Sequence, residues 1–381
     1  MNCNVCSAQL GHPVYESARS LTSLCDIYPE PTRVRLCEKC GHLQTDSIEN
    51  IDSYYDQEYT ILVNSEDEDQ IYEVRDGEPI YRTAHQVNTF ISKVALSDGN
   101  KILDYGCAKS SMMRTLYSEC PGIIPHLYDV SDRYIPFWNK FLQSDNWATY
   151  NIPDEWVGQF DVVTSFFSLE HIPQPKETLS SIRTLLKPGG IFYCVVPNVF
   201  SNIADFLVID HVNHFTESSL NFLLRTVGLK VKEIDDSSHE GAFVVVAELD
   251  SEMQLQDQNR TVVENDVSRI NEIASYWSSM AVHVREFESS IPEDATVAIY
   301  GAGFYSAFLI GCMENPDMVT CLIDQNPFLY GKEMKGLPIV SPGKLPESVD
   351  TILVGLNPAH ARNIIGEILS FSARNITYFY L

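Results

Sequence analysis

Positive charge is scarce in this sequence. Its 381 residues include 26 Lys and Arg against 52 Asp and Glu, which gives a formal net charge of -26 at pH 7. A surface this acidic argues against nucleic acid as a partner, because phosphate groups need a basic footprint on the protein. It argues equally against binding to an anionic membrane surface.

Long apolar runs are also missing. No stretch of about 18 apolar residues occurs, so we expect no transmembrane helix. The opening residues, Met1-Asn2-Cys3-Asn4-Val5-Cys6, lack the apolar centre of a signal peptide. Solenoid repeats and low-complexity runs are absent as well. We therefore expect a soluble, cytoplasmic protein, and its 44% of hydrophobic residues is enough to build the cores of two or three domains.

Four of the ten cysteines form two Cys-x-x-Cys pairs, Cys3/Cys6 and Cys37/Cys40, and the rest are scattered. A secreted disulfide framework would be shorter and denser in cysteine. In an intracellular chain, two such pairs predict one zinc ion, with each pair binding one edge of a tetrahedron. Because four protein ligands leave no open position, this zinc should be structural. A redox dithiol and idle thiols are the alternatives.

Residues 46–80 form an acidic connector, which we interpret first as a solvated face. From residue 44 to residue 80 there are twelve Asp or Glu and one basic residue, Arg75. The stretch is nevertheless too apolar for a free linker, and we expect it to pack on the next domain. Its apolar and aromatic residues are Tyr54, Tyr55, Tyr59, Ile61, Leu62, Val63, Ile71 and Tyr72.

From residue 85 onward, strand patterns alternate with helix patterns. Strands are expected at 101–105, 122–130, 160–166, 191–197 and 242–248, and helices at 177–186 and 220–227. This alternation predicts a parallel, doubly wound α/β sheet. A long helix should follow over 258–290, where apolar residues recur at steps of three and four.

A second, smaller α/β pattern begins near residue 291, with strands expected at 297–300, 321–324 and 351–355. The chain is therefore predicted to contain a zinc module (1–50), a doubly wound domain (51–250), a connecting helix (258–290) and a smaller Rossmann-like domain (291–381). The turn Gly301-Ala302-Gly303, with Asp324 ending the next strand, is half of a dinucleotide fingerprint and would suggest NAD if taken alone. A tight turn without a nucleotide is the interpretation that we favour.

The central domain resembles the class I S-adenosylmethionine-dependent methyltransferases. The resemblance rests on Asp104-Tyr105-Gly106 after the first strand, Asp129 ending the second, and Leu186-Lys187-Pro188-Gly189-Gly190 before a later strand. The family's glycine-rich loop is replaced here by Cys107-Ala108-Lys109-Ser110. The resemblance implies that Asp104 lies beside the methionine part of the cofactor, and that Gly106, Cys107 and Ala108 also belong to the cofactor site. It also implies that Asp129 binds the ribose, that Asn151 and Ile152 flank the adenine, and that Phe167 and Ser168 line the methyl-transfer site.

Two histidine-bearing loops should meet at the carboxyl edge of this sheet. His171 follows the strand at 160–166, and Asp210-His211 follows the strand at 191–197. Histidine can accept a proton near neutral pH, and Asp210 beside His211 suits an imidazolium.

The order of zinc module, methyltransferase core and C-terminal Rossmann-like unit resembles the sugar C-methyltransferases, which act on nucleotide-linked 4-keto-deoxysugars. By this resemblance, His211 is the base that removes a proton beside the ketone, and His171 lies near the ketone oxygen. The family's tyrosine two residues before the acid is Val208 here, and its His-Gly-Gly-Ser element is His239-Glu240-Gly241-Ala242. A sugar O-methyltransferase and a non-catalytic nucleotide-sugar or cofactor-binding protein are the alternatives.

Overall fold

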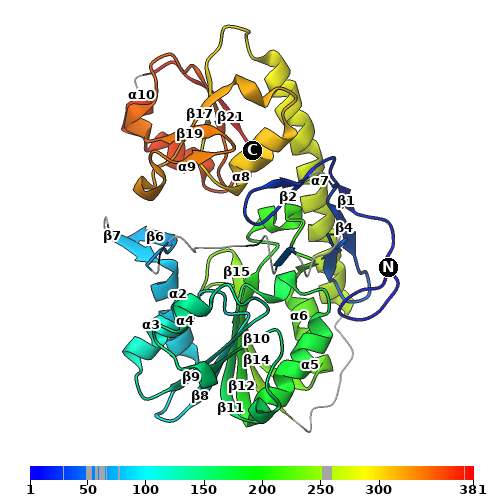
Figure 1. The fold of residues 1–381 in the computed structure, drawn as a ribbon. Helices are drawn as coiled ribbons and strands as arrows, with labels where there is room; N and C mark the ends of the chain where they lie inside the picture. Colours follow the sequence, from blue (N-terminus) through cyan, green and yellow to red (C-terminus); the bar gives the residue numbers. More distant parts are fainter. Residues whose placement is uncertain are drawn as a thin grey trace. The chain divides into compact units, whose positions relative to one another are not determined.

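The computed structural model describes residues 1–28, 30–48, 54–55, 59, 65, 67–75, 78–250, 260–372 and 374–381. Ile61, Leu62 and Val63 of the acidic connector lie outside the described residues. The chain divides into two compact units (Figure 1). Unit 1 comprises 1–12, 35–205 and 210–268, and unit 2 comprises 13–34, 206–209 and 269–381. Among the described helices, none combines the length and apolar character needed to cross a membrane.

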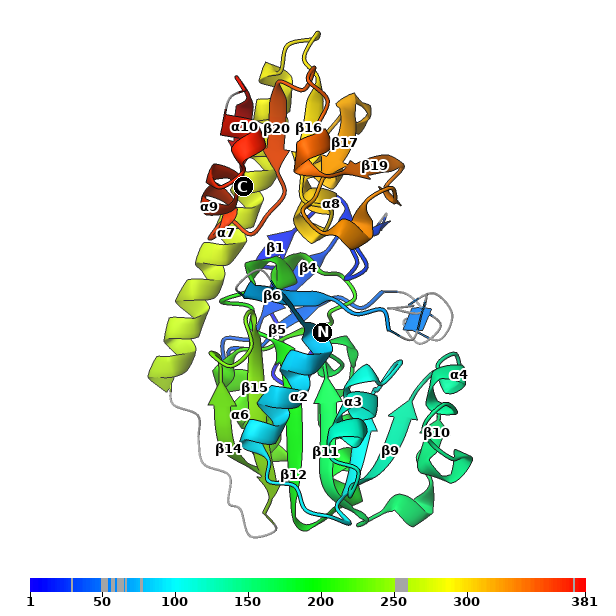
Figure 2. The same cartoon turned by 90° about the vertical axis from the view of Figure 1, so that its left-hand side faces the viewer.

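Unit 1 is built on a seven-stranded sheet in the order β10-β9-β8-β11-β12-β15-β14 (Figure 2). Its strands are β8 (Lys101–Tyr105), β9 (Ile124–Asp129), β10 (Trp147–Thr149), β11 (Phe160–Phe166), β12 (Leu186–Pro197), β14 (Leu229–Asp235) and β15 (Ala242–Leu249). The first five strands are parallel, as the alternating pattern predicts.

The expectation of a wholly parallel sheet is wrong for its last two strands. β15 pairs antiparallel with both β12 and β14. The chain passes from β14 to β15 through residues 236–241 without a helix. A parallel neighbour needs a long crossover connection, whereas a short loop can only return the chain antiparallel.

Helices cover both faces of this sheet, and each face has its own apolar core. Figure 1 shows α2 (Arg82–Lys93) and α3 (Ser111–Glu119) on one face, and α5 (Pro175–Leu185) and α6 (Glu217–Thr226) on the other. On the α2/α3 face, Phe90 and Met113 pack against Ile102 of β8. On the α5/α6 face, Leu179 and Leu220 share a core with Leu103, the next residue of β8. Successive side chains of a strand point to opposite faces, so β8 is buried on both sides.

The strand order places a crevice at the carboxyl edge of the sheet. From β8 the chain first builds outward through β9 and β10, and then returns to add β11 on the other side of β8. In open α/β sheets, ligands bind at the carboxyl ends of the strands on either side of such a reversal. The functional loops of unit 1 follow these same strands.

Smaller elements complete unit 1. β5 (Leu43–Thr45) pairs antiparallel with β13 (Asn213–His214), which joins the cysteine-bearing segment to the loop that carries His211. β6 (Ile71–Arg75) and β7 (Glu78–Tyr81) form a hairpin immediately before α2. A short helix, α4 (Ile135–Trp138), precedes β10.

Unit 2 contains a second, mostly parallel sheet in the order β18-β19-β17-β16-β20-β21. Its strands are β16 (Val297–Tyr300), β17 (Val319–Ile323), β18 (Glu333–Met334), β19 (Leu337–Val340), β20 (Thr351–Val354) and β21 (Thr377–Tyr380). Its helices are α8 (Phe304–Cys312), α9 (Ala361–Gly366) and α10 (Leu369–Ser372), and the long helix α7 spans Arg260–Ser290. The short strands β1 (Tyr15–Glu16), β2 (Ser20–Leu21), β3 (Ile27–Tyr28) and β4 (Arg33–Leu36) lie mainly in residues 13–34.

The predicted half-fingerprint of unit 2 forms a tight turn. Gly301 has φ 100°, and a Cβ there would lie 2.5 Å from the carbonyl oxygen of Gly355. The backbone N–H of Ala302 donates to the carboxylate of Asp324 at 2.9 Å. This contact ties the ends of β16 and β17 together.

Candidate functional site

The cofactor residues suggested by the sequence lie at, or just after, the carboxyl ends of neighbouring strands in unit 1. Asp104 lies in β8, where it is 3% exposed, and its carboxylate accepts hydrogen bonds from the hydroxyls of Ser110 (2.9 Å) and Thr164 (3.0 Å). Burial raises the pKa of Asp104 to about 6, although the two hydroxyls oppose this effect. The carboxylate therefore fixes the loop after β8 to the neighbouring strand β11.

Asp129, at the end of β9, holds the same loop from its other side. Its carboxylate accepts from the backbone N–H of Ala108 at 2.7 Å and from that of Ser131 at 3.1 Å. Burial raises the pKa of Asp129 to about 6, against the effect of these backbone donors. A carboxylate has about four lone-pair sites, so two backbone bonds leave capacity for the hydroxyls of a ligand.

The loops at this edge adopt left-handed backbone conformations with few glycines. Ala108 (φ 45°), Ser110 (φ 56°), Tyr150 (φ 60°) and Phe167 (φ 49°) all lie there. Each such non-glycine residue costs roughly 1–3 kcal/mol, and residues of this kind cluster at functional sites. The loop after β8 thus takes conformations that favour glycine although its sequence is glycine-poor.

Gly106 is the position where glycine is required. Its φ is 71°, and a Cβ would come within 2.2 Å of the Ser168 hydroxyl oxygen. Gly106, Cys107 and Ala108 follow β8, whereas Phe167 and Ser168 follow its neighbour β11. Asn151 and Ile152 follow β10, in which Thr149 pairs with Asp129. The structure therefore gathers the whole predicted cofactor set at one edge, and its role in binding stays a prediction.

His211 is paired with an acid that sequence reasoning missed. Its Nδ1 lies 2.5 Å from Oδ1 of Asp205, and the other carboxylate oxygen contacts Nδ1 of His214 at 2.8 Å. Burial lowers the pKa of His211, but the Asp205 carboxylate outweighs burial and raises the pKa to about 9. Burial opposes ionisation of Asp205, yet the two histidines hold the pKa of its carboxyl well below the usual range.

His171 faces His211 but has a different electrostatic environment. The two rings are 4.6 Å apart and nearly perpendicular, at 82°. Nδ1 of His171 lies 2.7 Å from the Tyr55 hydroxyl and 3.2 Å from the backbone carbonyl of Asp210. Burial and the neighbouring His211 lower the pKa of His171 to about 4. The Asp210 carboxylate is more distant, at 3.9 Å from Nδ1.

Tyr55 is a second residue that sequence reasoning left without a role. It belongs to the acidic connector, and its hydroxyl also donates to the Asp210 carbonyl at 2.6 Å. The aromatic content of the connector was the available signal, and Tyr59 packs beside the same imidazole, with ring centres 5.5 Å apart.

Glu170 brings a buried carboxyl to the histidine pair. It is 1% exposed, and burial raises its pKa to about 8 although the positive charge of His211 opposes this rise. Its Oε2 has no hydrogen-bond partner among the described residues. One ligand atom from each of Glu170, His171 and His211 lies within 4.8 Å of the others, so the three side chains surround a small common space.

The four predicted zinc ligands converge. The sulfur atoms of Cys3 and Cys40 are 3.6 Å apart, those of Cys6 and Cys37 are 3.4 Å apart, and all four lie within 4.8 Å of one another. A tetrahedron with Zn–S bonds of about 2.3 Å has edges of roughly 3.8 Å. The donor set therefore fits one zinc ion.

The two cysteine pairs are held by the same backbone pattern. Cys3 N–H donates to the carbonyl of Ala8, and the N–H of Ser7 donates back to the Cys3 carbonyl (2.8 and 2.9 Å). Cys37 repeats this pattern with His42 and Gly41 at 2.8 Å in both bonds. Ser7 (φ 58°) and Gly41 (φ 72°) both have the left-handed conformation. Two matching turns thus aim four thiols at one point.

Asn213 links these turns to the histidine loops. Its side-chain oxygen accepts from Asn4 Nδ2 and contacts His42 Nε2, both at 3.1 Å. Its side-chain nitrogen donates to the carbonyls of Leu169 (3.2 Å) and Ile172 (2.6 Å), which flank Glu170 and His171. The cysteine-bearing segment therefore supports the loop that carries His171.

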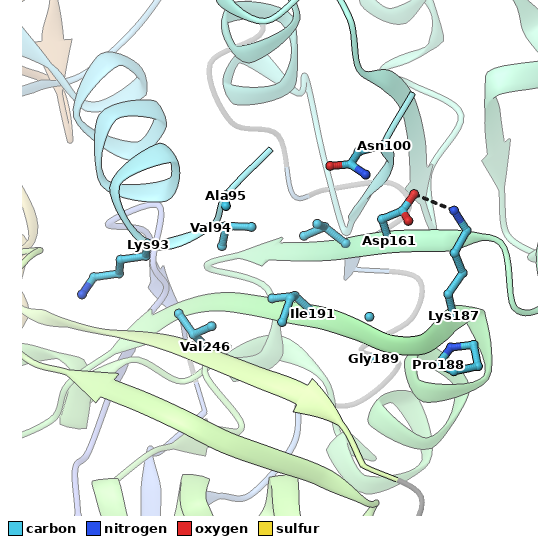
Figure 3. Close-up of a pocket in the computed structure, with 12 residues that line it drawn as sticks. Lys93, Val94, Ala95, Asn100, Asp161, Lys187, Pro188, Gly189, Ile191 and Val246 are labelled. Carbon is cyan, nitrogen blue, oxygen red and sulfur yellow. Dashed lines mark hydrogen bonds and ion pairs between the residues drawn. The ribbon is translucent and has the colours of Figure 1, made fainter. Parts of the chain in front are cut away.

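A cavity of about 360 Å³ lies elsewhere on unit 1 (Figure 3). It is lined at the amino ends of β11 and β12, which is the opposite edge of the sheet from the histidine pair. Its charged groups are already paired: the Asp161 carboxylate accepts from Lys187 at 2.7 Å and from the Lys101 backbone at 2.8 Å. We assign this cavity no part in the chemistry.

Fold and comparison agree on the class of protein. Residues 80–234 match the methyltransferase domain family. The chain carries a class I methyltransferase domain and is an S-adenosylmethionine-dependent methyltransferase. The predicted enzyme class and its methyl donor are thereby confirmed, whereas the zinc ion, the sugar substrate and the catalytic residues stay predictions.

Individual relatives cover different fractions of the chain. The C-methyltransferase NovU of Streptomyces niveus is 28% identical over 294 residues, covering 70% of this chain and 68% of NovU. A ubiquinone biosynthesis O-methyltransferase of Pseudomonas aeruginosa is 24% identical over 188 residues, covering 42% of this chain and 78% of that protein. Among solved structures, the CurJ carbon methyltransferase matches 44% of this chain and 55% of its own with a TM-score of 0.36 and 17% identity. A likeness this weak carries no information on the substrate.

Proposed function

We propose that this enzyme transfers the methyl group of S-adenosylmethionine to a carbon beside the ketone of a nucleotide-linked keto-deoxysugar. The observation that carries the proposal is the dyad of His211 and Asp205, which faces a neutral His171 across 4.6 Å at the carboxyl edge of the sheet. Support also comes from NovU, because its similarity extends well beyond the methyltransferase domain.

His211 acts as the base. Its Nδ1–H is directed to Asp205, which leaves Nε2 to take the proton from the carbon beside the ketone. This is the arrangement in which a buried carboxylate fixes the tautomer of a histidine base. Because its pKa is about 9, His211 is mostly protonated at neutral pH, and only the neutral fraction acts as the base.

His171 positions the keto-sugar beside His211. The Tyr55 hydroxyl donates its one proton to the Asp210 carbonyl, so the Nδ1–H of His171 donates to the Tyr55 oxygen and Nε2 carries a lone pair. With its pKa lowered to about 4, His171 remains neutral, and its Nε2 can accept a hydrogen bond from a hydroxyl of the sugar. The two histidines therefore have different roles, because their surroundings raise the pKa of His211 and lower that of His171.

The bond changes are then simple. The proton goes to His211, and the C–H electron pair forms the enolate. The enolate carbon attacks the methyl group of the sulfonium in line, and S-adenosylhomocysteine leaves. No redox partner is needed, and positioning supplies much of the rate enhancement. We further propose that Cys3, Cys6, Cys37 and Cys40 bind one structural zinc ion, which takes no part in these steps.

Solvent exchange tests this mechanism without methyl transfer. With a nucleotide-linked 4-ketosugar and no S-adenosylmethionine, the wild-type enzyme in heavy water should exchange deuterium into the carbon beside the ketone. His211→Ala should abolish the exchange and lower turnover by about 100-fold or more, while leaving cofactor affinity unchanged. His283→Ala, a change at an exposed histidine of α7, is the matched control.

Two outcomes would contradict the proposal in different ways. Exchange that persists in His211→Ala would transfer the role of base to another residue, with His171 examined next. No exchange in the wild type together with a methoxy product would establish sugar O-methylation, which is also the chemistry named for the Pseudomonas relative.

A further inference from the structure

Arg82 is a half-buried cation at the methyl-transfer edge, and no carboxylate among the described residues pairs with it. Its guanidinium carbon lies 4.1 Å from the ring centre of Phe167, and one of its nitrogens donates to Gln70 Oε1 at 2.7 Å. Among the described residues, no carboxylate lies within ion-pair distance of Arg82. Asp69 and Glu170 act on it only from further away, and burial lowers the pKa of its guanidinium.

In a chain with twice as many acidic as basic residues, it is unusual for a cation to have no carboxylate partner in the described part of the chain. A cation taken partly out of water is costly unless an anion compensates it. The guanidinium also presents a planar fork of N–H donors that matches phosphate and carboxylate oxygens. An arginine placed this way is suited to the anion of a ligand.

His239 presents a complementary group beside the same ring. It is 6% exposed, and its ring centre lies 5.3 Å from that of Phe167. Its Nδ1–H donates to the Glu240 carbonyl at 3.0 Å, and its Nε2 is buried without a partner among the described residues. Burial, with Arg82 and His85, lowers the pKa of His239 to about 4, so Nε2 carries a lone pair and accepts a hydrogen bond.

The surroundings hold His239 in place. Tyr72 of the β6–β7 hairpin stacks on His85 of α2, with ring centres 3.7 Å apart and planes at 10°. Both rings then meet His239 edge-on, at 5.0 and 5.1 Å. The Tyr72 hydroxyl accepts from the Glu240 backbone at 2.8 Å, which fixes the loop that bears His239. The imidazole is thus rigidly placed, with one polar atom unused.

We propose that Arg82 and His239 form a subsite for a glycosyl phosphate, in which Arg82 binds a phosphate oxygen and His239 Nε2 accepts a hydrogen bond from a hydroxyl of the attached sugar. This proposal rests on the proposed function and narrows it. A sugar phosphate carries an anion on its first carbon and hydroxyl groups on neighbouring carbons, so one ligand satisfies both groups. The ring of Phe167 contacts both Arg82 and His239 and gives the subsite an apolar surface.

Binding measurements on the full-length protein test the two halves separately. The probes are thymidine diphosphate, uridine diphosphate and their glucose conjugates, each titrated by calorimetry with S-adenosylhomocysteine present. Arg82→Gln should weaken both the nucleoside diphosphates and the conjugates, by roughly 10- to 100-fold. His239→Phe keeps an aromatic ring and should weaken only the conjugates, because the nucleoside diphosphates lack the sugar hydroxyl.

The controls separate this subsite from general charge and from the proposed function. Arg75→Gln removes a positive charge from the neighbouring hairpin, where Arg75 pairs with Glu73, and should leave every affinity unchanged. Unchanged S-adenosylhomocysteine binding in all variants reports that they are folded. If wild-type protein binds the probes and Arg82→Gln binds them equally well, the subsite is refuted and the proposed function stands. If wild-type protein binds S-adenosylhomocysteine but none of the probes, the nucleotide-sugar substrate itself is refuted.

Discussion

Asp205→Asn removes the charge that distinguishes His211 from His171. The pKa of His211 is about 9, against an ordinary value of 6.5. The difference corresponds to roughly 3 kcal/mol of preference for the protonated form. Burial alone lowers the pKa of His211, so in Asp205→Asn we expect the ring to titrate below 6.5.

Stability should follow the same charges. The pKa of His211 is higher in the folded than in the unfolded protein, so its stabilisation is complete below pH 6.5 and is lost as pH rises through about 9. The pKa of Asp205 is depressed on folding, so its stabilisation is present above 3.8 and is lost as pH falls through the folded value. The free energy of unfolding should therefore differ most between wild type and Asp205→Asn at about pH 4 to 6.5, and less above pH 9.

The direct assay is a titration of the histidine ring signals by NMR, with His211→Gln used to assign the resonance. Asp210→Asn is the matched control, because Asp210 is also buried but its carboxylate contributes less than Asp205 to the pKa of His211. Denaturant unfolding at several pH values tests the stability difference. A His211 signal that titrates near 6.5 in the wild type, or at the same pH in Asp205→Asn, would refute the reasoning.

Three further predictions follow from other parts of unit 1. Protein purified without added zinc should contain about one zinc per chain, and Cys37→Ser should lose it; unchanged metal content and folding would exclude the four-thiolate site. Asp129→Ala should weaken S-adenosylmethionine roughly tenfold or more in calorimetry, whereas exposed Asp145→Ala should not, and NAD should not bind there; equal affinities would remove Asp129 from the ribose site. Tyr55→Phe should lower turnover by about 2- to 10-fold with cofactor affinity unchanged, because His171 loses its hydroxyl partner; an unaltered rate would leave Tyr55 with a packing role alone.

The carboxyl edge of the sheet was largely predictable from sequence. The predicted strand at 101–105 contains Asp104, and the next strand ends at Asp129, which places both acids beside the loop after β8. The loops with His171 and His211 meet as expected. The partner of His211 was not predictable. Asp210 is its neighbour in sequence, yet Asp205, in the 3-10 turn Ile203–Leu207, supplies the carboxylate. Such turns have weak sequence signals, and only the folded path of the chain brings their side chains together.

The glycine-poor loop after β8 shows the same limit. Sequence alone suggests that Ala108 and Ser110 depart from the glycine-rich pattern, but both take the left-handed conformation. Their conformation is imposed by contacts from other segments, including the bonds to Asp104 and Asp129. The antiparallel β14–β15 pair was missed, although residues 229–249 are too few for two strands and a crossover helix.

The hydrogen bonds of Asn213 limit how far the chain can be shortened without disturbing the histidine loops. A fragment limited to residues 80–234, the part that matches the methyltransferase family, would keep His171, His211 and Asp205. It would lose Asn4 and His42 from Asn213, the Thr45 hydroxyl that lies 2.7 Å from His214 Nε2, and the β5 strand that pairs with β13. The loops that carry the histidines would then lack these supports. We therefore expect a fragment of residues 80–234 to be a poor catalyst, and shortened versions for engineering should retain the N-terminal cysteine segment.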